Sequence, residues 1–514
     1  MPHQPLDRPL FDWLKQRAFG ILLHLSSLPS NTGIGNLGPA AYRFVDFLAE
    51  AQTRFWQLCP LGPTGYGDSP YQCLSAFAGN PYFIDLNPLV EDGLLTADDV
   101  RPLQSLPGGH VNYGELYKTF WPILEKAHAN FVERDRRSVA DYEPLAAFQA
   151  SQSFWLDDYA LFMALKAQND GRCWLDWPET CRNYAKARKK YKSKALKAAI
   201  AAQVFYQYLF YAQLAQLRRY ATKQGVDLLG DVPIFVALDS ADVWSHPELF
   251  QLDKSLQPTA VAGVPPDYFS ADGQLWGNPL YDWDQHQKTG FAWWIERMKA
   301  NLAFYDSVRI DHFRGFESFW SVPAGSPTAR EGQWVKCPGL ELFKAIQQAC
   351  PDARIVAEDL GIITPEVDAL RRDTGLPGMA VLQFAFGGGD DNPYLPHNIS
   401  PNTVIYSGTH DNDTTLGWYH AESEHIREQV RRYLAVSGHD IAWDLIRAAL
   451  KSPANLAVAP FQDVLRLGGE ARLNTPGAAM GNWQWRYTPE LLEEAARAGL
   501  PALRELVQAT GRAE

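Results

Sequence analysis

The heptapeptide RIDHFRG, residues 309–315, holds the side chains of this chain that first suggest chemistry. A helical pattern over residues 291–304 is followed by a short apolar run at 307–310, which predicts a buried strand that ends at Asp311. Side chains alternate along a strand, so Arg309 and Asp311 point the same way, and the cation favours the ionised carboxylate. Such a carboxylate suits a nucleophile at a sugar carbon. On this stretch alone, a structural Asp–Arg pair is an equally good interpretation.

Two more short apolar runs end in acidic residues in the same way. Residues 354–357 lead to Glu358, and a run that begins at Thr403 leads to His410 and Asp411. Helix-length segments separate the three runs, and an α/β barrel places its chemistry where its strands end. Three carboxylates on one rim suit glycosidic bond chemistry, as a nucleophile, an acid/base, and a group that orients the sugar or balances the oxocarbenium charge.

Taken together, RIDHFRG, AEDLG and GTHDNDT resemble the motifs of the 4-α-glucanotransferases, glycoside hydrolase family 77 of the α-amylase clan, which includes amylomaltases and disproportionating enzymes. The resemblance runs from about residue 19 to about residue 487, through LLHLSSLPS, QLCPLGPTGYGDSPYQ, GDVPIFVALDSADVW, GVPPDYFSADGQLWGNPLYDW and GNWQWR. It implies transfer of α-1,4-glucan segments from a maltooligosaccharide, starch or glycogen donor to the 4-hydroxyl of a glucose or glucan acceptor. The implied mechanism is a retaining double displacement, with no metal and no organic cofactor.

The resemblance also assigns roles to the polar residues at the strand ends. Asp311 is the implied nucleophile, Glu358 the acid/base, and Asp411 the residue that binds the hydroxyls of the distorted sugar. Arg309 and His410 are the implied assistants. Retaining chemistry then predicts a raised pKa for Glu358 and a separation of roughly 5–5.5 Å between the carboxyl groups of Asp311 and Glu358.

Further residues are implied to contact bound glucan. In the family, the tyrosine that matches Tyr71 stacks on the sugar at the cleavage point, although Tyr71 as the plug of a tight loop is an alternative. Asp231 matches a residue that supports the site, and Tyr66 matches an aromatic at a second glucan site of some members. The remaining implied contacts are Ser69, Asp267, Tyr268, Phe269, Gln274, Trp276 and Asn482.

The chain as a whole predicts an α/β fold, a (β/α)8 TIM barrel with large inserted subdomains, as one catalytic domain over residues 1–514. Residues 89–225 show no barrel rhythm and predict an inserted, mainly helical subdomain. Residues 240–300 include the stretch 263–283, whose Gly, Pro and aromatic residues predict an irregular, functional loop. The resemblance implies that this loop is a lid over the substrate cleft. The predicted barrel strands are residues 19–25, 55–58, 226–230, 307–310, 354–357, 379–386, 403–410 and 456–460.

Composition excludes some partners and leaves others open. The net charge of −12 argues against nucleic acid and an anionic membrane as partners, whereas neutral maltooligosaccharides and α-1,4-glucans need no charge attraction. The six cysteines show neither CxxC pairs nor Cys/His ligand spacing, so we expect no zinc site and no disulfide framework. The N-terminal residues show no apolar stretch of signal length, so we expect a cytoplasmic protein, as a monomer or a weak homo-oligomer.

Three other functions stay open at this point. The three carboxylates cannot distinguish transfer from simple hydrolysis, in which water is the acceptor; the resemblance of the lid favours transfer. A non-catalytic glucan-binding barrel is disfavoured because all three acids are present. A different sugar as substrate is compatible with the same fold.

Overall fold

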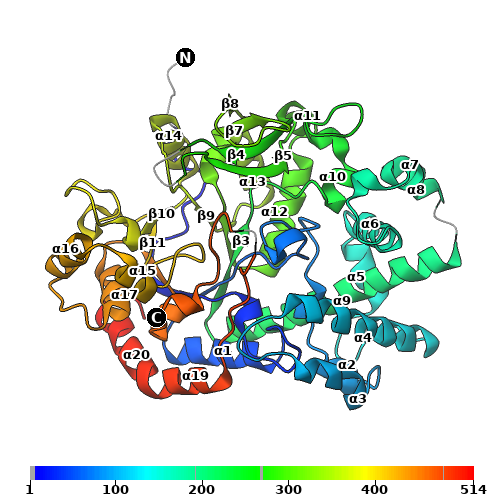
Figure 1. Ribbon diagram of the computed structural model, residues 1–514, viewed down its shortest axis with the longest axis horizontal. Coiled ribbons are helices and arrows are strands. Elements are labelled where there is room, and N and C mark those ends of the chain that lie inside the picture. The colour runs from blue at the N-terminus through cyan, green and yellow to red at the C-terminus, as the bar shows by residue number, and fades with distance from the viewer. Residues whose placement is uncertain (1–5, 191–192, 267–269, 479, 514) are drawn as a thin grey trace.

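The computed structural model describes residues 6–190, 193–266, 270–478 and 480–513. Within these ranges, eight parallel strands form a central sheet in the order β10-β11-β12-β1-β2-β3-β6-β9 (Figure 1). The outermost strands meet through a backbone hydrogen bond from Ala357 N to Pro377 O (2.9 Å), so the sheet closes and the predicted (β/α)8 barrel is confirmed. The strands are β1 (Ala18–Leu22), β2 (Phe55–Gln57), β3 (Asp227–Val232), β6 (Ser307–Ile310), β9 (Ile355–Ala357), β10 (Gly378–Val381), β11 (Thr403–Tyr406) and β12 (Leu456–Pro460).

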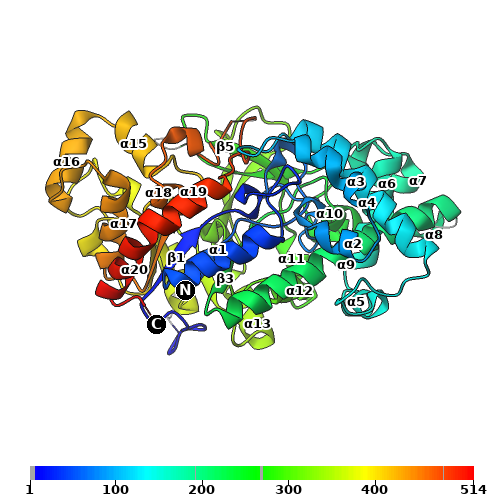
Figure 2. The ribbon, with the colours of Figure 1, turned by 90° about the horizontal axis from the view of Figure 1, so that it is seen from below.

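Alternation along the strands divides the core into two layers. In β1, Phe19 belongs to the large core between the barrel and its helices, whereas Leu22 belongs to the smaller core inside the barrel. The outer layer includes α1 (Pro39–Glu50), which starts at a proline that needs no backbone donor and buries one face that contains Phe44 and Leu48. Other surrounding helices are α9 (Lys194–Lys223), α12 (Ala292–Phe304), α13 (Gly339–Ala349), α14 (Pro365–Thr374), α17 (Ile441–Lys451) and α20 (Leu500–Ala509) (Figures 1 and 2).

Residues from both ends of the chain close the N-terminal end of the barrel. Trp13 donates from Nε1 to the carbonyl of Ile355 (2.9 Å), the first residue of β9. Arg512 is 1% exposed and donates to the carbonyls of Ala18 and Ala454, at the starts of β1 and β12. With that end filled, the opposite, carboxyl edge is left for a substrate.

The long connection between β2 and β3 is helical, and its last helix, α9, returns to the barrel. Gln207 of α9 exchanges two hydrogen bonds of 2.8 Å with the backbone of Gly79. Gln213 does the same with Asp85, at 2.8 and 2.9 Å. Each of these side-chain amides satisfies both a backbone N–H and a backbone carbonyl, and together they fix the segment after β2 against α9. The other helices of this connection are α2 (Asn87–Glu91), α3 (Ala97–Val100), α4 (Tyr113–Glu133), α5 (Leu145–Ser151), α6 (Leu156–Gln168), α7 (Glu179–Arg182) and α8 (Tyr184–Lys190).

The prediction of an irregular stretch over residues 263–283 is wrong for much of its described part. β4 (Ala260–Val264) and β5 (Gln274–Pro279) pair antiparallel and join β7 (Ser318–Pro323) and β8 (Gln333–Lys336) in a four-stranded sheet, in the order β5-β4-β7-β8. The glycines that suggested a loop have a role in this pairing, because a side chain at Gly263 would stand 2.5 Å from the carbonyl oxygen of Gln274. β7, which pairs with β4, begins more than 50 positions after the end of β4, so local composition gives no sign of this pairing.

Several predicted strands end too late. β1 stops at Leu22 and a 3-10 helix follows at Leu25–Ser27, and β10 stops at Val381 before the 3-10 helix Leu382–Phe384. The strand predicted to reach His410 also ends earlier, at Tyr406. Buried 3-10 turns carry the same apolar residues as a buried strand, so an apolar run does not reveal where the strand ends.

Candidate active site

The register between β3 and β6 gathers charge at the carboxyl edge of the barrel. Asp231 lies opposite Arg309, whose Nη1 binds Asp231 Oδ2 at 2.6 Å. The same guanidinium reaches along its own strand to Asp311, with Nη2 3.1 Å from Oδ1. The Arg309 side chain is only 5% exposed, so it is a buried cation held between two carboxylates. The predicted common orientation of Arg309 and Asp311 is therefore confirmed.

Glu358 leaves the neighbouring strand beside Asp311. β6 pairs with β9 so that Ile310 lies opposite Ala357, and the backbone N–H of Glu358 continues the ladder to Ile310 O (3.0 Å). The Glu358 carboxylate accepts from two backbone donors, His312 N at 2.7 Å and Leu360 N at 2.9 Å. Glu358 is thus bonded to the residue that follows Asp311, and two adjacent parallel strands place the two acids side by side.

Asp411 is held by side chains that come from loops. His410 Nε2 lies 3.3 Å from Asp411 Oδ2, and Asn474 donates from Nδ2 to Asp411 Oδ1 at 2.6 Å. The loop itself is anchored by the fully buried Asp463, which accepts from Ser407 Oγ and Thr415 N at 2.7 Å each. The Asp411 side chain is 45% exposed, so solvent reaches it although both of its oxygens have partners.

Tyr71 bridges the two sides of the site. Its hydroxyl donates to Asp231 Oδ2 (2.8 Å), and its ring stacks on His410 with a centroid distance of 5.1 Å and an interplanar angle of 16°. Trp483 lies against both rings, 5.9 Å from Tyr71 and 5.8 Å from His410. Ser69 accepts from Tyr71 N at 3.3 Å and so supports the turn that carries the tyrosine.

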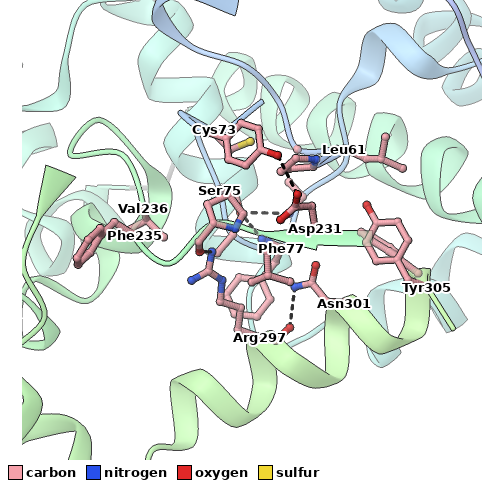
Figure 3. A pocket seen from close by; sticks show the side chains of 18 residues that line it. Leu61, Cys73, Ser75, Phe77, Asp231, Phe235, Val236, Arg297, Asn301 and Tyr305 are labelled. Atoms are coloured by element: carbon pink, nitrogen blue, oxygen red, sulfur yellow. Dashed lines mark hydrogen bonds between the residues drawn. The ribbon is translucent and has the colours of Figure 1, made fainter. Parts of the chain in front are cut away.

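A cavity of about 40 Å³ lies beside Asp231, between the barrel and α12 (Figure 3). Arg297 and Asn301 of α12 line its other wall, with Tyr305 at one end. Asp231 Oδ1 is buried and has no hydrogen-bond partner among the described residues. A cavity of this size has room for a few water molecules.

Burial and neighbouring charges give the carboxyl groups of the site different pKa values. Burial raises the pKa of Asp311 and of Glu358, and Arg309 opposes the shift in both. At Asp411 burial also acts to raise the pKa, but His410 and the Asn474 amide outweigh it and bring the pKa down to about 2. The raised pKa predicted for Glu358 is thus confirmed, and the site holds two acids with raised pKa values beside one that stays ionised.

The four-stranded sheet of β4, β5, β7 and β8, here called the small sheet, contacts this site through Trp276 of β5. Its indole packs edge-on against the ring of His312, with centroids 4.9 Å apart, and its Nε1 donates to the exposed Gln274 (3.2 Å). Since His312 N donates to Glu358, this contact connects β5 to the acid. The implied contacts Asp267, Tyr268 and Phe269 lie outside the described residues.

The structure gives the local setting of two more implied positions. Asn482 bonds within its own loop, accepting from Thr475 N at 2.9 Å and donating to Ala478 O at 2.9 Å. Tyr66 begins a 3-10 helix, Tyr66–Asp68, after β2.

Residues that sequence reasoning missed lie around Asp411. Asn474, Arg472 and Asp463 hold its loop, and Gln383 donates to Asp413 O at 2.9 Å. None of the four belongs to a motif with a recognised spacing. Trp483 had a signal, since it stands inside GNWQWR.

Some other kinds of site are not formed by the described residues. Within the described ranges, no group of three or more His, Cys, Asp or Glu is arranged to hold a metal ion. All six cysteines are free thiols. Of the helices in the described part of the chain, none combines the length and apolar character needed to cross a membrane.

The barrel and its site define a (β/α)8 protein with a cluster of carboxylates at the carboxyl edge of the barrel. Residues 23–492 match the family described as 4-alpha-glucanotransferase, glycoside hydrolase family 77, and the chain belongs to this family.

Individual relatives match over nearly the full length. The 4-alpha-glucanotransferase of Thermus thermophilus is 50% identical over 500 residues, which cover 96% of this chain and 99% of the relative. The 4-alpha-glucanotransferase of Synechocystis sp. is 48% identical, over 96% of this chain and 98% of its own length. The solved amylomaltase from Streptococcus agalactiae in complex with acarbose superposes with a TM-score of 0.91 at 37% identity, covering 97% of this chain and 100% of that one.

Proposed function

We propose that this chain is a 4-α-glucanotransferase that moves α-1,4-glucan segments from a donor to the 4-hydroxyl of an acceptor glucose or glucan. The observation that carries the proposal is the cluster of Arg309, Asp311 and Glu358. Arg309 forms an ion pair with Asp311, and Glu358 accepts a hydrogen bond from the backbone N–H of His312, the residue after Asp311. The relatives named 4-alpha-glucanotransferase and the acarbose complex of the Streptococcus agalactiae amylomaltase support α-glucans as the substrate class.

The first half of the reaction forms a covalent glycosyl-enzyme. An Asp311 oxygen bonds to the anomeric carbon as the bond from that carbon to the leaving oxygen breaks, and Glu358 gives its proton to that oxygen. Burial raises the pKa of Glu358 and so helps it to hold a proton at neutral pH. Arg309 favours the ionised form of Asp311 that the attack needs.

The second half returns the segment to an acceptor. The acceptor 4-hydroxyl attacks the anomeric carbon, its proton goes to Glu358, and the bond to Asp311 breaks. Asp411, with its low pKa, stays ionised and binds hydroxyls of the distorted sugar, while His410 assists it. Tyr71 stacks on the sugar at the cleavage point, a role that its contacts with Asp231 and His410 support.

Several side chains on the rim are proposed as contacts for the neighbouring glucose units. They are Ser69, Gln274 and Trp276, together with the lid positions Asp267, Tyr268 and Phe269. Asn482 and Tyr66 are proposed as contacts farther from the cleavage point, Tyr66 at a second glucan site. No part of this mechanism uses a cofactor.

Incubation with maltotriose, followed by separation of the products, tests the proposal. Transfer gives glucose together with maltooligosaccharides longer than maltotriose. Hydrolysis gives only glucose and maltose, and would establish the alternative in which water is the acceptor. A chain that binds maltotriose without turnover would establish the non-catalytic barrel.

The setting of the enzyme is also a proposal. We infer a cytoplasmic protein, monomeric or weakly self-associating, that acts in starch or glycogen metabolism. The net charge of −12 supports a partner other than nucleic acid or an anionic membrane. Residues 89–225 and 240–300 are the proposed inserted subdomains. Cell fractionation and size-exclusion chromatography test the location and the oligomeric state.

A further inference from the structure

The segment that follows β12 holds Asp411 from outside its own loop. Asn474 donates from Nδ2 to Asp411 Oδ1 at 2.6 Å. Arg472 donates from Nη2 to the backbone carbonyl of Asp411 (2.8 Å) and from Nε to the carbonyl of Asn474 (2.8 Å). The Arg472 guanidinium therefore binds the backbones of both Asp411 and Asn474, and the side chains of these two residues share one hydrogen bond.

The far side of Asn474 is fixed by a closed loop. Asn482 accepts from Thr475 N, the residue after Asn474, at 2.9 Å. Trp483 N donates to Leu473 O, the residue before it, at 2.7 Å. The chain therefore returns on itself just beyond Asn474, and Trp483 then packs against His410. Asn474 has little freedom to turn away from Asp411.

The chemistry of the contact depends on an amide at this position. Only Nδ2 of an asparagine donates, so the bond to Asp411 has one direction and favours the ionised carboxylate. The other Asp411 oxygen faces His410 Nε2 at 3.3 Å. With one partner on each oxygen, the carboxylate is held against rotation as well as against protonation.

We propose that Asn474 is a positioning residue that fixes the orientation and the ionisation of Asp411, with Arg472 and Asn482 holding Asn474 in place. The proposal rests on the function given above to Asp411, which binds the sugar most tightly when it is distorted at the cleavage point. A misplaced Asp411 therefore weakens binding of the transition state more than binding of the ground state.

The first variant is Asn474→Ala, assayed for transfer on maltotriose. We expect kcat to fall by roughly tenfold to a hundredfold, because one hydrogen bond to a charged group is lost, while KM changes by less than about threefold. Thermal unfolding shows whether the loop or the fold is lost instead.

The second variant, Asn474→Asp, gives a signature that a structural role would not give. It keeps the shape but sets two carboxylates against each other, and such a pair shares a proton as the pH falls. We expect its kcat relative to the parent enzyme to rise at least tenfold between pH 7.5 and pH 5, because the protonated aspartate donates to Asp411 again. The relative kcat of Asn474→Ala should not rise in this range.

Other charged and titratable groups face Asp411 and are unchanged in both variants. They are Arg309, Asp311, His410, Arg472 and Cys59. Their contributions cancel in the ratio to the parent enzyme, so the difference between Asn474→Asp and Asn474→Ala reports on position 474 alone. Asn402→Ala, at the opposite end of the barrel, is the control and should match the parent.

Asp411→Asn separates this proposal from the proposed function. If Asp411→Asn is inactive while both variants at position 474 keep kcat within twofold of the parent, Asn474 has no positioning role. If both variants lose the same factor of activity at every pH, Asn474 is only structural and the proposal is overturned. A fully active Asp411→Asn would instead overturn the role of Asp411 itself.

Discussion

Glu358 and Asp411 are both acids on the carboxyl edge of one barrel, yet they are held in opposite ways. Two backbone N–H groups hold Glu358, from His312 and Leu360, and burial raises its pKa. Two side chains hold Asp411, from His410 and Asn474, and its pKa falls to about 2. Backbone N–H groups just beyond the ends of β6 and β9 thus fix the acid that must carry a proton, and side chains fix the acid that must stay charged.

The largest expected effect comes from the nucleophile beside Glu358. Asp311→Asn removes the attacking oxygen while keeping shape, so turnover of maltotriose should fall below roughly a thousandth of the parent rate. The unfolding temperature should change little. Activity above that level, in protein free of parent enzyme, would remove Asp311 from the nucleophile role.

The next largest effect concerns Arg309, the cation that pairs with Asp231 and Asp311. Arg309→Met leaves the buried Asp231 and the half-buried Asp311 without their cation, so the free energy of unfolding should fall by about 3–5 kcal/mol. Urea unfolding measures this loss. The double variant Arg309→Met with Asp231→Asn removes one of the unpaired charges and should recover part of the stability. No recovery would mean that the loss comes from packing.

The contrast between the acids also predicts the pH profile. Attack needs ionised Asp311, whose pKa burial raises to about 6, so the acidic limb of kcat/KM should lie near pH 6 and above the ordinary value of 3.8. The alkaline limb should follow loss of the proton from Glu358, whose pKa is also raised. Asp411 titrates far below this range and should add no limb, so an acidic limb near pH 4 would contradict this assignment.

The features of this molecule that the sequence predicts are the barrel strands and the acids at their ends, and the features that it does not predict are the contacts made by distant loops and strands. Buried parallel strands read as apolar runs, so all eight barrel strands were predictable, and with them the carboxyl-edge positions of Asp311 and Glu358. His410 lies in a motif, but the other partners of Asp411, Arg472 and Asn474, come from a stretch without a motif, so no local pattern reveals them. The small sheet was missed for a similar reason, because β4 pairs with β7 across a long stretch of chain.

The smallest expected effect lies at the contact between Trp276 of the four-stranded sheet and His312, the residue that donates to Glu358. Trp276→Ala uncovers His312, so water should reach the glycosyl-enzyme more easily and the ratio of hydrolysis to transfer should rise by roughly twofold to tenfold. Leu275→Ala, an exposed neighbour on β5, is the matched control and should leave the ratio unchanged. The ratio is obtained by measuring new reducing ends, which report hydrolysis, and redistributed oligosaccharides, which report transfer. An unchanged ratio in Trp276→Ala would refute the water-excluding role.

The same ratio tests the lid prediction at residues outside the described ranges. Tyr268→Ala combined with Phe269→Ala should raise hydrolysis relative to transfer if these rings cover the cleft. A parallel loss of both activities and of stability would show that they serve only to pack the loop.

The covalent glycosyl-enzyme tests the central claim most directly. The variant Glu358→Gln is mixed with maltotriosyl α-fluoride, whose leaving group needs no acid, and the digested protein is mapped by mass spectrometry. The account predicts one added maltotriosyl group on Asp311, because the second step lacks its base. An adduct on Asp411 or on any other residue, or release of the β-anomer without an adduct, would contradict it.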